Sequence, residues 1–373
     1  MFRFMTAGES HGPCLTAILD GFPSGLVVNI EKINHELSRR QGGYGRSHRQ
    51  NIEKDEVEIL GGVLYGRTTG APISLRINNR DWVNWREQWA SGELPKLKIP
   101  RPGHADYAGM IKYGFDDARI ILERASARET AARVAVGALA KQFLAQFDIF
   151  VGSYVNEIGD VEAQIPVLSQ TELWELAENS DVHCPDKIAE ERMRAAIDKA
   201  RQAKDTLGGI FTVSADGLPV GLGTFVQWDR KLDTLLAAAV MSIHAIKGVE
   251  IGPAFENARL PGSKVHDDLY PGENSSVIRR TNRAGGLEGG MTNGEPIILR
   301  AAMKPISTTG IPHESVDLSN GEARHPEYQR SDICAVPAAS VIGEAMVAWT
   351  LATAVDEKYS GDNMAEKLRC LKT

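Results

Sequence analysis

The stretch Thr16-Ala-Ile-Leu-Asp-Gly-Phe-Pro-Ser-Gly-Leu26 has a counterpart later in the chain, Thr212-Val-Ser-Ala-Asp-Gly-Leu-Pro-Val-Gly-Leu222, and both read T-x-x-x-D-G-x-P-x-G-L. A second pair follows in the same order. Gly66-Arg-Thr-Thr-Gly-Ala-Pro-Ile-Ser-Leu-Arg76 and Gly290-Met-Thr-Asn-Gly-Glu-Pro-Ile-Ile-Leu-Arg300 share the pattern G-x-T-x-G-x-P-I-x-L-R. Two ordered matches indicate that one folding unit occurs twice in this chain.

A third and weaker match supports the duplication. Arg124-Ala-Ser126 corresponds to Arg330-Ser-Asp332, and Gly137 and Gly343 follow these stretches at the same spacing. The copies lie about 200 residues apart, which is far longer than the repeat of a solenoid array. We therefore expect two fused copies of one fold unit, related by a pseudo-twofold axis.

The size and composition of the chain fit a soluble globular protein. It has 373 residues, of which 42% are hydrophobic and 24% are charged. We expect one large domain over residues 1–373, with pseudo-repeats at about 1–205 and 206–373. The net charge of −7 argues against a protein that binds nucleic acid over its whole surface.

The cysteines and the apolar runs predict a cytoplasmic protein. The N-terminus shows no apolar signal segment, and the longest apolar run, residues 235–243, is too short to span a bilayer. The four cysteines lie far apart without a CxxC pair, so we expect reduced thiols and no metal site. They are Cys14, Cys184, Cys334 and Cys370.

Hydrophobic periodicity and turn residues predict the α+β class with antiparallel sheets. The two Asp-Gly-x-Pro turns separate apolar runs, so each is expected to open a hairpin. Strands are expected in residues 57–77, 210–226 and 296–303, and helices in residues 127–147, 186–204, 232–246 and 338–354. A strand–GxGxxG–helix unit and a GxxxxGK[ST] loop are both missing from the sequence, which disfavours the Rossmann and P-loop folds.

Two histidines stand beside glycines, which let the backbone turn sharply and approach a ligand closely. His11 lies in Gly8-Glu-Ser-His-Gly12, and His104 lies in Arg101-Pro-Gly-His-Ala-Asp106. Histidine titrates nearest to neutral pH, so two such loops near arginines suggest acid–base chemistry on an anion. For a lone histidine, a hydrogen-bonded turn residue is the commoner interpretation.

An arginine-rich segment strengthens the case for an anionic ligand. Residues 38–50 contain Arg39, Arg40, Arg46 and Arg49 around glycines, and no acidic residue lies between Glu36 and Glu53. The planar guanidinium pairs bidentately with carboxylate or phosphate. A solvated basic loop and an RNA contact are the alternatives.

Other stretches offer further anion-binding groups. Ser126 and Glu129 have the spacing of a capping box at the start of a helix near Arg124 and Arg128, where backbone N–H groups and the helix dipole favour an anion. An ordinary helix cap explains the pattern equally well. Asp332 stands where the first copy has Ser126, and it could form an ion pair or relay protons.

These motifs together resemble those of the chorismate synthase family over essentially the whole chain. The matching stretches are residues 8–12, 39–49, 101–106, 124–130, 247–252, 285–296, 304–308 and 330–332. The resemblance implies helices layered between antiparallel sheets, a homotetramer, and a 1,4-anti elimination of phosphate from 5-enolpyruvylshikimate 3-phosphate to give chorismate. It also implies a need for reduced FMN, without net redox change.

The resemblance also implies roles for individual residues. His11 would serve the departing phosphate, His104 would stabilise the anionic reduced flavin, and Asp332 and Ser10 would relay a proton. Residues that would bind the flavin are Arg124, Ala125, Ser126, His244, Ala245, Gly289, Lys304, Pro305, Ile306, Ser307, Thr308 and Arg330. Residues that would bind the substrate or NADP are Arg40, Arg46, Arg49, Arg101 and Arg128.

Two points stay open at the level of the sequence. The family usually has asparagine where this chain has His244, which is larger and titratable. NADPH is a possible reductant for the flavin, but nothing in 373 residues looks like an added reductase domain, so we expect reduced FMN to be supplied from outside. An ordinary redox flavoprotein and a non-catalytic anion-binding or RNA-binding protein are the competing functions.

Overall fold

A computed structural model describes residues 2–47, 53–92, 94–273, 276–329 and 331–371. Two antiparallel sheets dominate it. The first has the order β1 (Arg3–Ala7), β2 (Cys14–Asp20), β6 (Ile73–Asn78) and β3 (Val57–Gly61). The second has the order β10 (Ile246–Ile251), β15 (Ile297–Met303), β9 (Gly209–Asp216), β7 (Phe150–Ile158) and β8 (Val161–Glu162).

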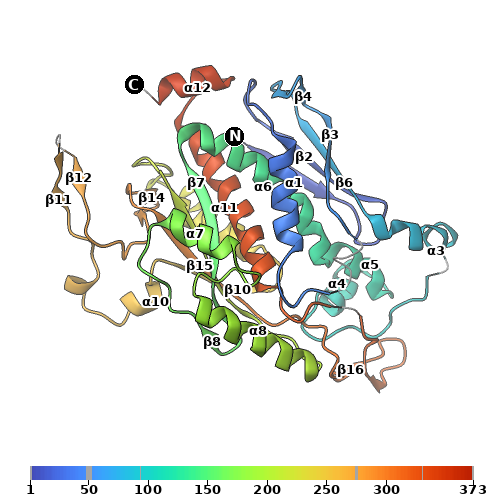
Figure 1. Cartoon of the computed structure of the whole chain (residues 1–373). Helices are drawn as coiled ribbons and strands as arrows, with labels where there is room; N and C mark the ends of the chain where they lie inside the picture. The colour runs from blue at the N-terminus through green and yellow to red at the C-terminus, as the bar shows by residue number, and fades with distance from the viewer. Residues whose placement is uncertain (1, 48–52, 93, 274–275, 330, 372–373) are drawn as a thin grey trace.

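A layer of helices lies between the two sheets (Figure 1). It consists of α1 (Ile30–Gln41), α6 (Thr130–Leu144), α9 (Leu232–Met241) and α11 (Val336–Lys358). Helix α6 contacts the first sheet, α11 contacts the second, and the two helices pack on each other. The helices predicted in residues 127–147, 186–204, 232–246 and 338–354 all exist, as does the expected combination of helices and antiparallel strands.

The remaining elements are short or peripheral. The other helices are α3 (Arg86–Ser91), α4 (Asp106–Tyr113), α5 (Ala118–Ala125), α7 (Gln170–Glu178), α8 (Lys187–Gln202), α10 (Ala254–Asn257) and α12 (Met364–Cys370). The 3-10 turns are η1 (Arg80–Asn84), η2 (Ala127–Glu129), η3 (Ala145–Phe147), η4 (Trp228–Arg230) and η5 (Gly262–Lys264). Two-residue strands form four small ladders: β4 (Val63–Leu64) with β5 (Arg67–Thr68), β11 (Tyr270–Pro271) with β12 (Val277–Ile278), β13 (Leu287–Glu288) with β14 (Met291–Thr292), and β16 (Ser315–Val316) with β17 (Ala323–Arg324).

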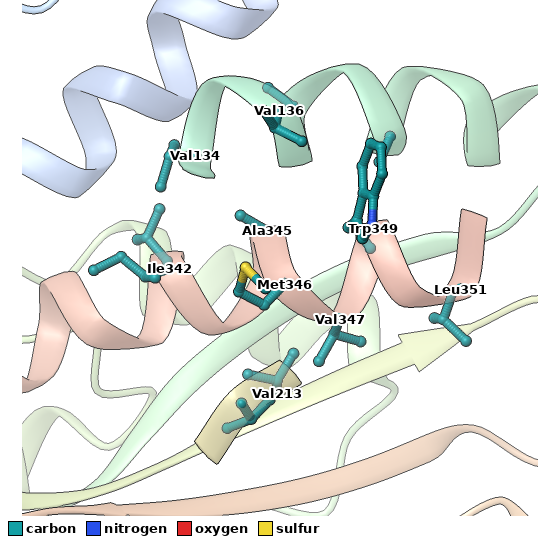
Figure 2. Packing of buried hydrophobic residues seen from close by; sticks show 14 of the residues in the cluster. Val134, Val136, Val213, Ile342, Ala345, Met346, Val347, Trp349 and Leu351 are labelled. Atoms are coloured by element: carbon teal, nitrogen blue, oxygen red, sulfur yellow. The ribbon is translucent and has the colours of Figure 1, made fainter. Parts of the chain in front are cut away.

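The main hydrophobic core lies where α6 and α11 cross (Figure 2). Ile342 and Trp349 of α11 point toward α6, and Ile342 lies next to Val134. On the other side of α11, Val347 points toward Val213 of the second sheet. Nearly every residue of both helices is buried, so both are apolar all round, as expected of helices covered on every side. Helix α11 is 23 residues long and apolar enough to span a bilayer, but 94% of its apolar window is buried inside the protein, so it is a core helix.

The paired sequence motifs occupy matching positions in the two sheets. Thr16 is opposite Arg76 between β2 and β6, and Thr212 is opposite Arg300 between β9 and β15. In both motifs a threonine hydroxyl also binds the proline of the Asp-Gly-x-Pro turn. The hydroxyl of Thr68 donates to the carbonyl of Pro23 at 2.6 Å, and its counterpart Thr292 donates to Pro219 at 2.6 Å.

The structure corrects one prediction about this organisation. After Asp20 and Asp216 the chain leaves the sheet toward α1 and α9 rather than turning into a hairpin. The threonine networks explain this, because they bind each turn to a segment that lies far downstream in the sequence. The repeat boundary expected near residue 205 stays a prediction; β7, which precedes it in the chain, belongs to the second sheet and pairs with β9.

Candidate active site

A cavity of about 860 Å³ opens where the two halves meet, at the first turns of α6 and α11. It is lined by residues from loops that lie far apart in the sequence. The predicted site residues in its wall are Ser10, His11, Arg40, Arg46, Arg101, His104, Ala125, Ser126, Arg128, His244, Ala245, Lys304, Ile306, Ser307, Thr308 and Asp332. All four residues predicted as catalytic therefore share one pocket.

His11 is held by a buried carboxylate that the sequence analysis did not single out. Its Nδ1 lies 2.9 Å from Oε1 of Glu123, and its backbone N–H donates to Oε2 of the same side chain at 2.8 Å. Glu123 is buried on α5. The His11 ring also packs on Trp85, with 4.3 Å between the ring centroids.

His104 has a carboxylate partner of its own, which it shares with an arginine. Its Nδ1 lies 2.5 Å from Oδ1 of Asp106, and Arg101 donates to both oxygens of Asp106 at 2.8 and 3.0 Å. Burial alone would raise the pKa of Asp106, but the hydrogen bonds from His104 and Arg101 hold it well below its usual range. The carboxylate thus stays ionised between the guanidinium of Arg101 and the ring of His104.

Two of the predicted substrate-binding arginines form a buried cluster at the wall of the pocket. Arg40 and Arg128 both donate to Asp55, at 2.9 and 2.6 Å. Burial lowers the pKa of Arg40 to about 10, with Asp55 opposing the shift and Arg128 adding to it. Glu53 adds a second buried carboxylate, with Oε2 3.8 Å from Nη2 of Arg128, so the two guanidinium groups face two carboxylates within this cluster.

Arg46 is the third predicted arginine in the pocket, and it is paired with Asp332. Nη1 of Arg46 lies 2.7 Å from Oδ2 of Asp332, while Oδ1 accepts the backbone N–H of Ser47 at 2.7 Å. Of the two roles predicted for Asp332, an ion pair or a proton relay, the structure shows the ion pair. Arg49 and Arg330 lie outside the described residues, and Arg39 points away from the pocket into an ion cluster with Glu344.

The residues predicted to bind the flavin are mostly but not all in the pocket. Gly289, Arg124 and Pro305 do not line it. Arg124 instead donates to the backbone and hydroxyl of Thr6 at 3.1 and 2.8 Å, and Gly289 forms the turn between β13 and β14. The family resemblance brought these residues into the prediction, and their role toward a flavin stays a prediction.

The predicted capping box at Ser126 and Glu129 is not formed. The Ser126 hydroxyl accepts the N–H of Arg128 at 3.3 Å and donates to the Ser10 hydroxyl at 3.0 Å. The Glu129 carboxylate accepts instead from the hydroxyl of Thr6 and from Nε of Arg133. Ser126 therefore links the helix start to the His11 loop.

The pocket has features that suit a bound group with polar edges. Nδ1 of His244 and Nε of both Arg40 and Arg46 are buried without a hydrogen-bond partner among the described residues. Burial lowers the pKa of His244, Glu129 opposes the shift, and Arg133, His104 and Arg124 add to it. Donors and acceptors left unsatisfied in a cavity usually mark the place of a ligand or water.

Several pocket residues could not have been found by sequence patterns alone. Glu123 appears in the sequence as one acid in an ordinary helix, and Trp85 and Asp81 belong to a segment, residues 80–91, that carries no motif. Asp55, which pairs the two buried arginines, lies just beyond the arginine segment. Asp106 was visible as part of the His104 motif, and its adjacency to that histidine was the only available signal.

Comparison with known proteins identifies the relatives of this chain. A family model described as chorismate synthase matches residues 2–355. The chorismate synthase of Desulforamulus reducens is 55% identical over 98% of this chain and 96% of its own length. That of Geobacter sulfurreducens is 54% identical over 99% of this chain and 97% of its own length. A crystal structure of a chorismate synthase superimposes with a TM-score of 0.81 at 44% identity, covering 100% of this chain and 96% of the other.

Proposed function

This chain belongs to the chorismate synthase family, and we propose that the pocket at the first turns of α6 and α11 is its active site. The protein is a lyase of the shikimate pathway that eliminates phosphate from 5-enolpyruvylshikimate 3-phosphate to give chorismate. The observation that carries the assignment of the site is the convergence of His11, His104 and four arginines on one cavity.

His11 is proposed to serve the departing phosphate. Loss of a phosphate dianion builds up negative charge on the leaving oxygens, and a protonated imidazole compensates for that charge or delivers a proton to it. Glu123 and Trp85 hold the ring in place, so the substrate does not have to order it during the reaction.

The arginine cluster is proposed to bind the anionic groups of the substrate. Arg40 and Arg128 are positioned by Asp55, and Arg46 is positioned by Asp332. Guanidinium groups fixed in this way can form bidentate bonds with phosphate or carboxylate at little entropic cost. Asp332 would exchange its pairing with Arg46 for a proton-relay role when the substrate takes over that arginine.

The residues present fit a reduced FMN beside the substrate. The cavity is large enough for two small molecules, and the unsatisfied Nδ1 of His244 lies in its wall. Ser126, Lys304, Ser307 and Thr308 would hold the flavin. When bound, reduced flavin supplies electron density transiently to a substrate whose C6 proton is not acidic. His104, oriented by Asp106, would stabilise its negative charge.

Further properties of the protein are proposed on the same basis. We expect a cytoplasmic homotetramer in which reduced FMN is supplied from outside, with NADPH as a reductant that the chain does not require. The matching registers of β2–β6 and β9–β15 support a fold made of two fused copies within one domain. The four cysteines are all free, which suits a reducing compartment.

The assignment is tested by assaying His11→Ala and His104→Ala with chemically reduced FMN under anaerobic conditions. We expect each variant to release phosphate at least about 100-fold more slowly than the wild type, since a positioned acid or base contributes that much. Flavin absorbance should stay constant over many turnovers. Near-normal rates in both variants would exclude the acid–base assignment, and stoichiometric flavin oxidation would place the protein among ordinary redox flavoproteins.

A further inference from the structure

Two hydrogen bonds join the carboxylate of Glu123 to His11, one to the backbone N–H and one to the imidazole. Oε2 of Glu123 accepts the backbone N–H of His11 at 2.8 Å, and Oε1 lies 2.9 Å from Nδ1 of the imidazole. The backbone carbonyl of Glu123 in turn accepts the N–H of Ser10 at 3.0 Å. The Glu123 side chain is 5% exposed, so water does not compete for these bonds.

The chemistry of the partners determines where the imidazole proton resides. An ionised carboxylate only accepts hydrogen bonds, and a backbone N–H only donates. Both oxygens of Glu123 therefore require donors, and Nδ1 of His11 must carry a hydrogen. The neutral imidazole then has its lone pair on Nε2, and the cation carries its second proton there.

We propose that Glu123 is a positioning residue that keeps the proton-exchanging nitrogen of His11 at Nε2. This inference rests on the proposed role of His11 at the leaving phosphate. Glu123 acts through the histidine and is not itself a catalytic residue. Its task is to present Nε2 in one protonation pattern, so that proton exchange with the phosphate always occurs at the same atom.

The environment of His104 shows that this role is not common to both histidines. Asp106 also contacts Nδ1 of its histidine, but its two oxygens additionally accept three bonds from Arg101. The charge of Asp106 is thus shared with a guanidinium. Among the described residues, no lysine or arginine forms an ion pair with Glu123, and both of its carboxylate oxygens bind His11.

Substitution of Glu123 by glutamine separates positioning from simple support of the loop. The amide offers one acceptor and one donor, and the obligatory donor, the backbone N–H of His11, must take the amide oxygen. The amide NH₂ then faces Nδ1, which has to accept. Glu123→Gln is therefore expected to keep the loop in place while moving the imidazole proton to Nε2 and disfavouring the cation.

The decisive measurement is the ¹⁵N spectrum of protein labelled in its nine histidines, with His11 assigned by its loss in His11→Asn. In wild-type protein in alkaline buffer we expect His11 to carry its hydrogen on Nδ1, and in Glu123→Gln on Nε2. A wild-type His11 protonated on Nε2 would overturn the proposal without any variant being needed.

Kinetics with reduced FMN provide the second readout. Glu123→Gln should lower kcat by about 100-fold with little change in KM, because a general acid is lost while the binding arginines remain. Glu172→Gln, in the capping box of α7, is the matched control and should leave kcat unchanged. A Glu123→Gln enzyme with a switched tautomer and full kcat would overturn the inference. Full activity in His11→Ala would instead remove the proposed role of His11, leaving the tautomer result intact.

Discussion

The first sheet leaves its outer face open, whereas the second sheet carries a helix on that face. Met5 of β1 and Ile18 of β2 are paired and are 75% and 55% exposed. On the second sheet, Trp174 of α7 donates from Nε1 to Ser214 of β9 at 2.9 Å and lies against Gly152 of β7. The two sheets thus agree in the pairing of Thr16 with Arg76 and of Thr212 with Arg300, but they differ in what covers their outer faces.

The two central helices, α6 and α11, also differ in the elements that they contact. Gly137 of α6 and Gly343 of α11 match in the sequence, yet Gly137 faces α11 and Gly343 faces the second sheet. The next residue is Ala138 in α6 but the fully buried Glu344 in α11. Glu344 binds Arg39, Lys141 and Ser153 and so ties α11 to α1, α6 and β7. Of the two matched positions, only Glu344 of α11 is a polar junction between elements.

The largest effect is expected from Glu344→Gln, which would remove this difference between the helices. Arg39 and Lys141 would lose their most buried partner, so the free energy of unfolding at neutral pH should fall by about 3 kcal/mol. Denaturant titration measures this, with the exposed Glu357→Gln on the same helix as control. A loss equal to that of the control would contradict the view of Glu344 as a junction.

The same variant has a defined pH dependence. Burial alone would raise the pKa of Glu344, but Arg39 and Lys141 hold it well below the ordinary value of 4.5. A depressed carboxyl pKa stabilises the fold above the ordinary value, and this contribution is lost as the pH falls toward the folded-state pKa. The stability gap between wild type and Glu344→Gln should therefore narrow on acidification below about pH 4.5.

A smaller effect is expected from alanine at the two matched glycines. A Cβ at Gly137 would lie 2.3 Å from Cβ and 2.4 Å from Cα of Ala345, so α6 and α11 would have to separate. At Gly343 it would meet side-chain atoms of Val213 and Phe211 at 2.8 and 2.9 Å, which can shift. Overpacking lowers the free energy of unfolding by about 1–3 kcal/mol, whereas the higher helix propensity of alanine over glycine raises it by up to about 1 kcal/mol.

The comparison of these variants is made by thermal or denaturant unfolding. We expect Gly137→Ala to lose about 2 kcal/mol and Gly343→Ala to lie within about 1 kcal/mol of the wild type. If Gly343→Ala proved the more damaging substitution, the two helices would not differ as described, because the sheet rather than the partner helix would be the rigid neighbour.

The smallest difference in free energy of unfolding is expected between Thr68→Val and Thr292→Val. These two variants test the threonine network that both halves contain. Each hydroxyl donates to a proline carbonyl and accepts a leucine N–H, that of Leu26 or Leu222. Valine keeps the shape but leaves two buried groups unsatisfied, so each variant should lose about 1–3 kcal/mol. The two losses should agree within about 0.5 kcal/mol. A clearly larger loss at one site would show that the two turns have unequal roles.

The sequence alone determined the parts of this protein that depend on local pattern. The apolar stretches in residues 127–147 and 338–354 predicted helices, and both exist as α6 and α11, which are apolar all round because the fold covers them on every side. Glycine and proline spacing revealed the repeated turns, since a threonine network of fixed geometry tolerates few residue types. The glycine-framed histidines and the clustered arginines announced an anion site, and His11, His104, Arg40, Arg46 and Asp332 do share one cavity.

Only the tertiary structure decided the partners of those residues. Glu123 lies 112 positions from His11, and Asp55 meets Arg128 across 73 positions. Such contacts form when sheets and helices close on one another, and they leave no trace in the local pattern. The structure also showed that β7 belongs to the second sheet and that Gly289 does not line the pocket. The local sequence specifies which side chains could take part in the chemistry, but packing between segments far apart in the sequence sets their charge, their orientation and their contacts.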